Sequence, residues 1–115
     1  MKFLVILLIM FCGITFAHPP SGINLDFDLE KKVVYVELSH GVKSEDHYIY
    51  YVEVSLNGKV IIKQESSKQF DENVQKYVYQ IPELKENDKI SITGKCNKFG
   101  SLKRDFLIKT EETKK

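Results

Sequence analysis

The chain contains little cysteine and no tryptophan: among its 115 residues, cysteine occurs only at Cys12 and Cys96. At most one intrachain disulfide can form, and none forms if the N-terminal segment that carries Cys12 is removed. An excess of charge is missing too, because 17 basic and 16 acidic residues leave a net charge of +1. Without a concentrated basic patch or an aromatic–basic platform, no binding to nucleic acid is expected.

A long hydrophobic run is also absent. The apolar stretch at residues 3–16 is shorter than the about 20 residues that a membrane-spanning helix needs. It follows Lys2 and ends in Thr-Phe-Ala, which gives the basic start, apolar centre and small-x-small exit of a secretory signal peptide. We therefore predict a signal peptide at residues 1–17, cleaved after Ala17. The mature protein would be periplasmic or secreted, with no membrane attachment once the leader is removed.

What remains after cleavage is predicted to be one domain at residues 18–110, followed by a disordered tail at residues 111–115. The dominant pattern in this domain is alternation. In residues 23–29, hydrophobic side chains occupy every second position, which is typical of a half-buried strand. No window shows sustained helical spacing, and there is no internal repeat or low-complexity stretch.

Further strands are predicted at 33–38, 48–56, 60–62, 74–81, 90–96 and 102–110. In the third strand the alternation aligns four residues on one face, namely Tyr50, Val52, Val54 and Leu56. This strand is separated from the next one, at 60–62, by Asn57 and Gly58, the strongest short signal for a type I′ hairpin turn. About seven short strands in one small domain indicate an all-β, immunoglobulin-like antiparallel β-sandwich.

The cleaved chain keeps only four soft metal ligands: His18, His40, His47 and Cys96. His40 and His47 flank the loop 41–46, and Cys96 ends a predicted strand, so the loops at one pole of a sandwich can bring them together. Imidazole and thiolate ligands suit iron, copper or zinc, whereas calcium and magnesium prefer oxygen. Coordination would also explain an unpaired thiol in an exported domain.

Each candidate also has an ordinary interpretation. Cleavage would make His18 the N-terminal residue, whose amine and imidazole can chelate a metal as in copper histidine-brace proteins; otherwise the terminus is simply frayed. Taken alone, His40 is a loop residue, His47 is a polar residue that starts a strand, and Cys96 is a small buried side chain. Their combination favours a metal site.

Two motifs contain three of these four residues. His40 with the segment 45–54, Glu-Asp-His-Tyr-Ile-Tyr-Tyr-Val-Glu-Val, is similar to the His-Pro … Glu-His-Tyr-Ile-x-Trp-Ile-Glu segment of superoxide reductases, the desulfoferrodoxin and neelaredoxin family. Residues 96–100, Cys-Asn-Lys-Phe-Gly, resemble that family's Cys-Asn-x-His-Gly turn. The resemblance implies an immunoglobulin-like iron domain, with four histidines in a plane, an axial cysteine and a sixth position open to superoxide. It makes His40 and His47 equatorial ligands and Cys96 the axial thiolate.

The chain departs from the family pattern at three places. Phe99 stands at the position of the second motif's histidine, Gly41 replaces the proline, and the upstream Glu-Lys-His segment has no counterpart. His18 can take the place of a missing histidine. Phe99 is expected to make the pocket more apolar and to block one approach to the metal.

Three functions remain open as hypotheses. In the first, ferrous iron at His18, His40, His47 and Cys96 gives one electron to superoxide, with water or Lys98 as the catalytic acid and a separate electron donor. The second is a copper- or zinc-binding or electron-transfer protein of the same fold. The third is a metal-free binding module similar to the immunoglobulin-like subunit of sulfur-oxidation carrier complexes, which has a His-Pro-Met … His-Phe-Ile strand.

Overall fold

The computed structural model describes residues 18–110, which form an all-β structure of seven strands. The predicted signal peptide at 1–17 and the predicted tail at 111–115 lie outside the described residues. In chain order the strands are β1 (Gly22–Asp28), β2 (Val33–Ser39), β3 (Ile49–Leu56), β4 (Lys59–Glu65), β5 (Val74–Gln80), β6 (Lys89–Cys96) and β7 (Ser101–Leu107). Within residues 18–110 there is no helix long and apolar enough to cross a membrane.

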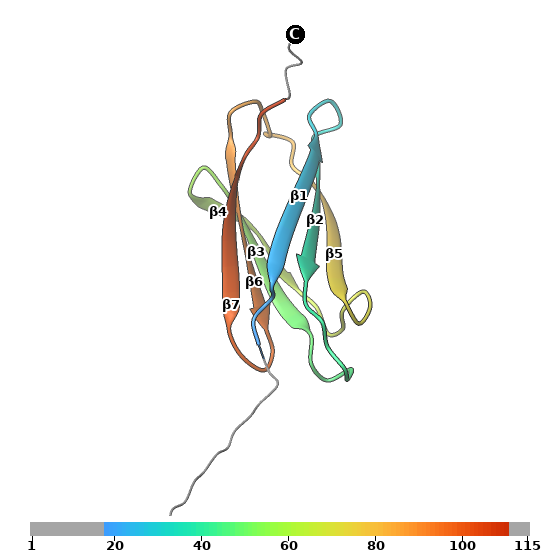
Figure 1. The fold of residues 1–115 in the computed structure, drawn as a ribbon. Helices are drawn as coiled ribbons and strands as arrows, with labels where there is room; N and C mark the ends of the chain where they lie inside the picture. The colour runs from blue at the N-terminus through green and yellow to red at the C-terminus, as the bar shows by residue number, and fades with distance from the viewer. Residues whose placement is uncertain (1–17, 111–115) are drawn as a thin grey trace, which may run out of the picture.

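The strands form two antiparallel sheets that face each other (Figure 1). One sheet has the order β1-β2-β5 and the other has the order β4-β3-β6-β7. Every neighbouring pair is antiparallel, as in the pairing of β1 with β2 that sets Ile23 opposite Leu38. The predicted all-β class and two-sheet sandwich are therefore confirmed, whereas the narrower immunoglobulin-like assignment stays a prediction.

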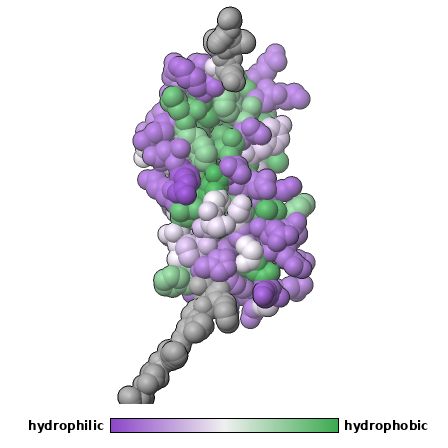
Figure 2. All heavy atoms as spheres, viewed as in Figure 1, coloured by the Kyte–Doolittle hydropathy of each residue, from purple (hydrophilic) through white to green (hydrophobic). Residues whose placement is uncertain are grey.

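Alternating hydrophobic residues build the core between the two sheets. On β2, the side chains of Val34, Val36 and Leu38 are almost completely buried, with exposed fractions of 0%, 2% and 0%. Burying one such side chain contributes about 1.5–3 kcal/mol to the free energy of unfolding. Partly buried Leu25 and Phe106 pack against this core from β1 and β7. Figure 2 shows hydrophobic residues along the face where these two strands lie, bordered by hydrophilic ones.

The predicted alternation is wrong at the start of β3. The pattern places Tyr50 on the face of Val52, but the exposed fraction of Tyr50 is 39%, and Ile49 is the buried residue. A β-bulge causes this change, because Ile49 pairs with Cys96 while Tyr51 already pairs with Lys95. The extra residue re-aims the side chains that precede it, which is the usual effect of a bulge. The bulge therefore determines how the segment before Ile49 meets the end of β6.

Turn chemistry explains the hairpin between β3 and β4. Asn57 and Gly58 have φ values of 50° and 89°, as the predicted type I′ turn requires.

The last strand ends earlier than expected, at Leu107, because the following residues leave the sheet. There the amide of Ile108 donates to the carbonyl of Asp88 at 2.8 Å, so the chain closes the pole opposite the candidate site.

All four candidate ligands lie at one pole of the sandwich, the lower end in Figure 1. His18 precedes β1, His40 follows β2, His47 precedes β3 and Cys96 ends β6. Because neighbouring strands are antiparallel, the start of one and the end of its partner meet at the same pole. The topology therefore brings together residues that are up to 78 positions apart in the sequence (96 − 18).

Candidate metal centre

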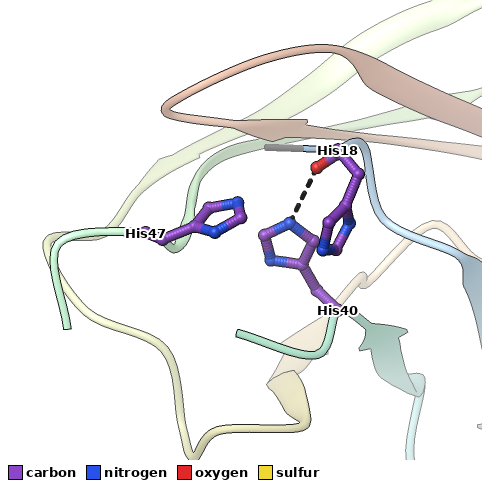
Figure 3. A group of neighbouring side chains, drawn as sticks. All are labelled: His18, His40 and His47. Carbon is purple, nitrogen blue, oxygen red and sulfur yellow. Dashed lines mark hydrogen bonds between the residues drawn. The ribbon is translucent and has the colours of Figure 1, made fainter. Parts of the chain in front are cut away.

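Three histidines form a compact cluster at this pole. The ligand atoms of His18, His40 and His47 all lie within 4.8 Å of one another, so the three residues could hold a metal ion. Figure 3 shows their rings gathered in one place, although they come from three separate segments. The ring centroids are 4.8 Å apart for His18–His40, 5.2 Å for His18–His47 and 4.8 Å for His40–His47.

His40 is the buried member of the cluster, with an exposed fraction of 0%. Its Nε2 lies 3.0 Å from the carbonyl oxygen of His18, the contact drawn in Figure 3. Its Nδ1 lies 2.6 Å from Oε1 of Gln69. The amide of His40 donates to the carbonyl of Asn73 at 2.9 Å, which anchors the residue to the loop between β4 and β5. This ring therefore has almost no freedom to move.

His18 is held by the chain that leads into β1. The next residues are fixed to the sandwich, because Pro20 is buried and the amide of Ser21 donates to the carbonyl of Ser39 at 2.8 Å. The ring nitrogens of His18 lie 3.0 Å from two carbonyl oxygens, Nδ1 from that of Pro19 and Nε2 from that of Gly41. Metal binding through this imidazole would replace one of these contacts.

Gly100 links the N-terminal segment to the turn after Cys96. Its φ is +85°, and a Cβ at this position would lie 3.0–3.3 Å from three atoms of the Pro19 ring. A side chain here would therefore be strained twice, by the backbone conformation and by contact with the residue next to His18.

We expect Gly100→Ala to lower the free energy of unfolding by about 2 kcal/mol, measured by urea denaturation, and to weaken metal binding at His18. Gly58→Ala is the matched control, because its φ is +89° but a Cβ there has nothing within 4 Å. The control should lose only about 1 kcal/mol and keep its metal affinity. If the two variants lost the same stability and the same metal affinity, the close approach of Pro19 to Gly100 would not be what requires glycine at position 100.

His47 brings the thiol of Cys96 to the cluster. Its Nε2 lies 3.0 Å from Sγ of Cys96, which also accepts a hydrogen bond from the amide of Lys98 at 3.3 Å. Cys96 is a buried free cysteine, with an exposed fraction of 5%. Nitrogen and sulfur atoms bound to one ion, at about 2.0–2.1 and 2.3 Å, lie roughly 3–4 Å apart. The observed spacing lies at the short end of that range and is also that of a hydrogen bond, and the group of ligand atoms within 4.8 Å of one another consists of the three histidines without Cys96.

The surroundings of His47 favour its neutral form. Burial lowers the pKa of His47 below its usual value, and the neighbouring rings of His40 and His18 and the ammonium of Lys98 lower it further. A neutral imidazole retains the lone pair that a metal requires. The preceding Asp46 stays ionised, because hydrogen bonding from Ser44 and the charge of Lys98 lower the pKa of its carboxyl.

Lys98 and Phe99 follow Cys96 in the turn between β6 and β7. The Nζ of Lys98 is 3.8 Å from Oδ2 of Asp46, so its charge faces that carboxylate, and its main-chain amide contacts the sulfur. A catalytic role for Lys98 stays a prediction. Phe99 has an exposed fraction of 64%, so this side chain points largely to solvent. Phe99 also lines a surface hollow together with Cys96, so the expected block on one approach to the metal stays a prediction.

Two polar residues hold the ligand segments together, and neither is among the four candidate ligands. The side chain of Asn97 accepts a hydrogen bond from the amide of Tyr48 at 2.9 Å and donates to the carbonyl of Asp46 at 2.8 Å. It thus bridges both sides of His47, and its place directly after Cys96 in the resembling motif was a usable signal. Gln69 lies in a polar loop, and no motif distinguishes it from other loop residues.

The three imidazoles could therefore hold a metal ion at this pole, where the sulfur of Cys96 lies 3.0 Å from one of them. A surface hollow lined by the loop residues 41–44 reaches His18 and His47, so the cluster is open to small molecules. No family model, curated protein or solved structure matches the chain.

Proposed function

We propose that the protein binds one iron ion through His18, His40, His47 and Cys96 and reduces superoxide to peroxide in an exported compartment. The observation that carries this proposal is the 3.0 Å contact between Nε2 of His47 and Sγ of Cys96 beside the three-histidine cluster. A thiolate ligand increases electron density at iron, which favours reduction of a bound oxygen species. The motif resemblance, which also includes His40, His47 and Cys96, supports iron over other metals.

The proposed reaction balances with one electron. Superoxide takes one electron from ferrous iron and two protons from solvent to give hydrogen peroxide, and a one-electron donor of the same compartment restores the ferrous state. The residues of the chain contribute binding and access. His40 is buried and fixed, Cys96 is shielded from solvent, and the hollow beside His18 and His47 admits a small molecule.

The test begins with protein exported and processed by its host and purified without chelator. We expect one iron per chain and, after oxidation, a visible thiolate-to-ferric charge-transfer band. Cys96→Ala should remove the band, whereas Phe99→Ala should leave it unchanged. Phe99 is the control because it lies in the same turn but is exposed and offers no donor atom. A Cys96→Ala protein that keeps its metal content would contradict the ligand assignment.

Activity is tested by stoichiometry. Reduction yields one peroxide for each superoxide and no dioxygen, whereas dismutation releases one dioxygen for every two superoxide ions. Four N/S donors also satisfy the tetrahedral preference of zinc, so a chain that purifies with zinc would replace the redox function with a structural or binding one. Protein that binds none of iron, copper or zinc would contradict the metal centre itself.

A further inference from the structure

The loop between β4 and β5 supplies a side chain that contacts the histidine cluster from behind. Gln69 has an exposed fraction of 7%, and its Oε1 lies 2.6 Å from Nδ1 of His40. A metal-binding imidazole usually donates its second ring N–H to an oxygen atom, which fixes the orientation and the tautomer of the ring. Gln69 is in the position of such a partner.

Main-chain contacts determine which way the amide of Gln69 faces. Its Oε1 accepts a hydrogen bond from the amide of Ile49 at 3.1 Å, and its Nε2 donates to the carbonyls of His40 and Asp71, both at 3.0 Å. The flipped amide would set its NH₂ group against the N–H of Ile49 and its oxygen against two carbonyls. Only the observed orientation satisfies all three groups, so an oxygen atom faces His40.

We infer that Gln69 is a positioning residue of the metal centre: its oxygen holds the proton of His40 on Nδ1 and leaves Nε2 as the metal-binding atom. This inference rests on the proposed metal function. With Nδ1 bonded to Gln69, Nε2 is the ring nitrogen left for a metal, and its 3.0 Å contact with the main-chain carbonyl of His18 is the one that metal binding would replace. A neutral ring can donate from only one nitrogen, and the contact with Gln69 is the shorter of the two.

A second buried glutamine, in β5 just after the loop that contains Gln69, provides a matched control. Gln75 has an exposed fraction of 3%, accepts hydrogen bonds from the amides of Phe70 and Lys76, and donates to the carbonyl of Lys68 at 3.0 Å. Like Gln69, it stabilises the loop through its amide group. Its hydrogen bonds go to the main chain and not to an imidazole.

The experiment compares Gln69→Met with Gln75→Met, since methionine keeps the length of the side chain and removes the amide. Cobalt(II) binding is measured by its visible absorption, and the protonated ring nitrogen of His40 is assigned by long-range ¹H–¹⁵N NMR of metal-free protein above about pH 8, where imidazole is neutral. We expect Gln69→Met to bind cobalt about 10–100-fold more weakly than wild type and Gln75→Met to bind it nearly normally. The proton of His40 should lie on Nδ1 in wild type and Gln75→Met and move to Nε2 in Gln69→Met.

The two readouts separate the inference from the proposed function. If wild type binds no cobalt, iron or zinc, the metal function fails, and a proton on Nδ1 that depends on Gln69 would still assign Gln69 its positioning role. If wild type binds metal but both variants lose affinity equally, Gln69 serves only the loop and the inference is overturned. A wild-type proton on Nε2 of His40 also overturns it. Unfolding curves of both variants confirm that each remains folded under the conditions of measurement.

Discussion

Replacing His40 with alanine is expected to abolish metal binding and to lower the free energy of unfolding of the metal-free protein by about 2–4 kcal/mol. His40 is completely buried, and its ring contacts both Gln69 and the carbonyl of His18. Alanine would leave a cavity among polar atoms and remove the buried imidazole of the cluster. Metal content and urea denaturation of the same preparation measure the two losses.

His47→Ala separates these two effects. His47 is only partly buried, and its side chain contacts Cys96 without joining the hydrogen bonds that fix the loop between β4 and β5. We expect it to lose metal binding as completely as His40→Ala, with a loss of stability below about 1 kcal/mol. If His40→Ala retained stoichiometric metal while His47→Ala lost it, the buried histidine would be a structural residue and not a ligand.

The fold was predictable because its signals are local. The alternation in residues 23–29 needs only the neighbouring side chains, and the Asn57–Gly58 turn requires only the positive φ values that these two residues tolerate. The burial of Ile49 could not be predicted from its sequence neighbours. It is buried because a bulge forms opposite Cys96, and the pairing partner of a strand is not encoded in the strand itself.

The clustering of histidines at one pole was predictable in part. Two strand ends placed His40 and His47 at one pole, because antiparallel neighbours return to the pole where they began. The position of His18 depends on contacts with residues far away in the sequence, such as the packing of Pro19 against Gly100. Gln69 could not be identified, since a glutamine in a polar loop differs from its neighbours only by what the folded chain brings near it.

Gly94 lies against Leu38 and Pro20 in the core of the sandwich. Replacing it with alanine is expected to have a large effect on stability. A Cβ at Gly94 would lie 2.3 Å from Cδ2 of Leu38 and 3.5 Å from Cγ of Pro20. Leu38 is completely buried, so its side chain has little room to move away. We expect a loss of about 2–4 kcal/mol in the free energy of unfolding, measured by urea denaturation. Gly41→Ala, where a Cβ meets nothing within 4 Å, is the control and should change stability by less than about 0.5 kcal/mol.

The crowding at Gly94 should also reach the metal ligands. Leu38 lies two residues before His40, and Pro20 lies two residues after His18, so a methyl group that pushes both outward would spread these two histidines. We therefore expect Gly94→Ala to bind cobalt more weakly than wild type in urea-free buffer, where the variant is still folded. Gly58→Ala, in the hairpin turn at the far end of β3 from His47, should bind cobalt as wild type does.

A double-mutant cycle with Leu38→Ala identifies the cause of the stability loss. Leu38→Ala alone should cost about 2–5 kcal/mol, because it leaves a cavity in the core. In the double variant, the methyl group introduced by Gly94→Ala would enter that cavity, so the combined loss should fall short of the sum by more than about 1 kcal/mol. Strict additivity would mean that the close approach of Gly94 to Leu38 is not what requires glycine there.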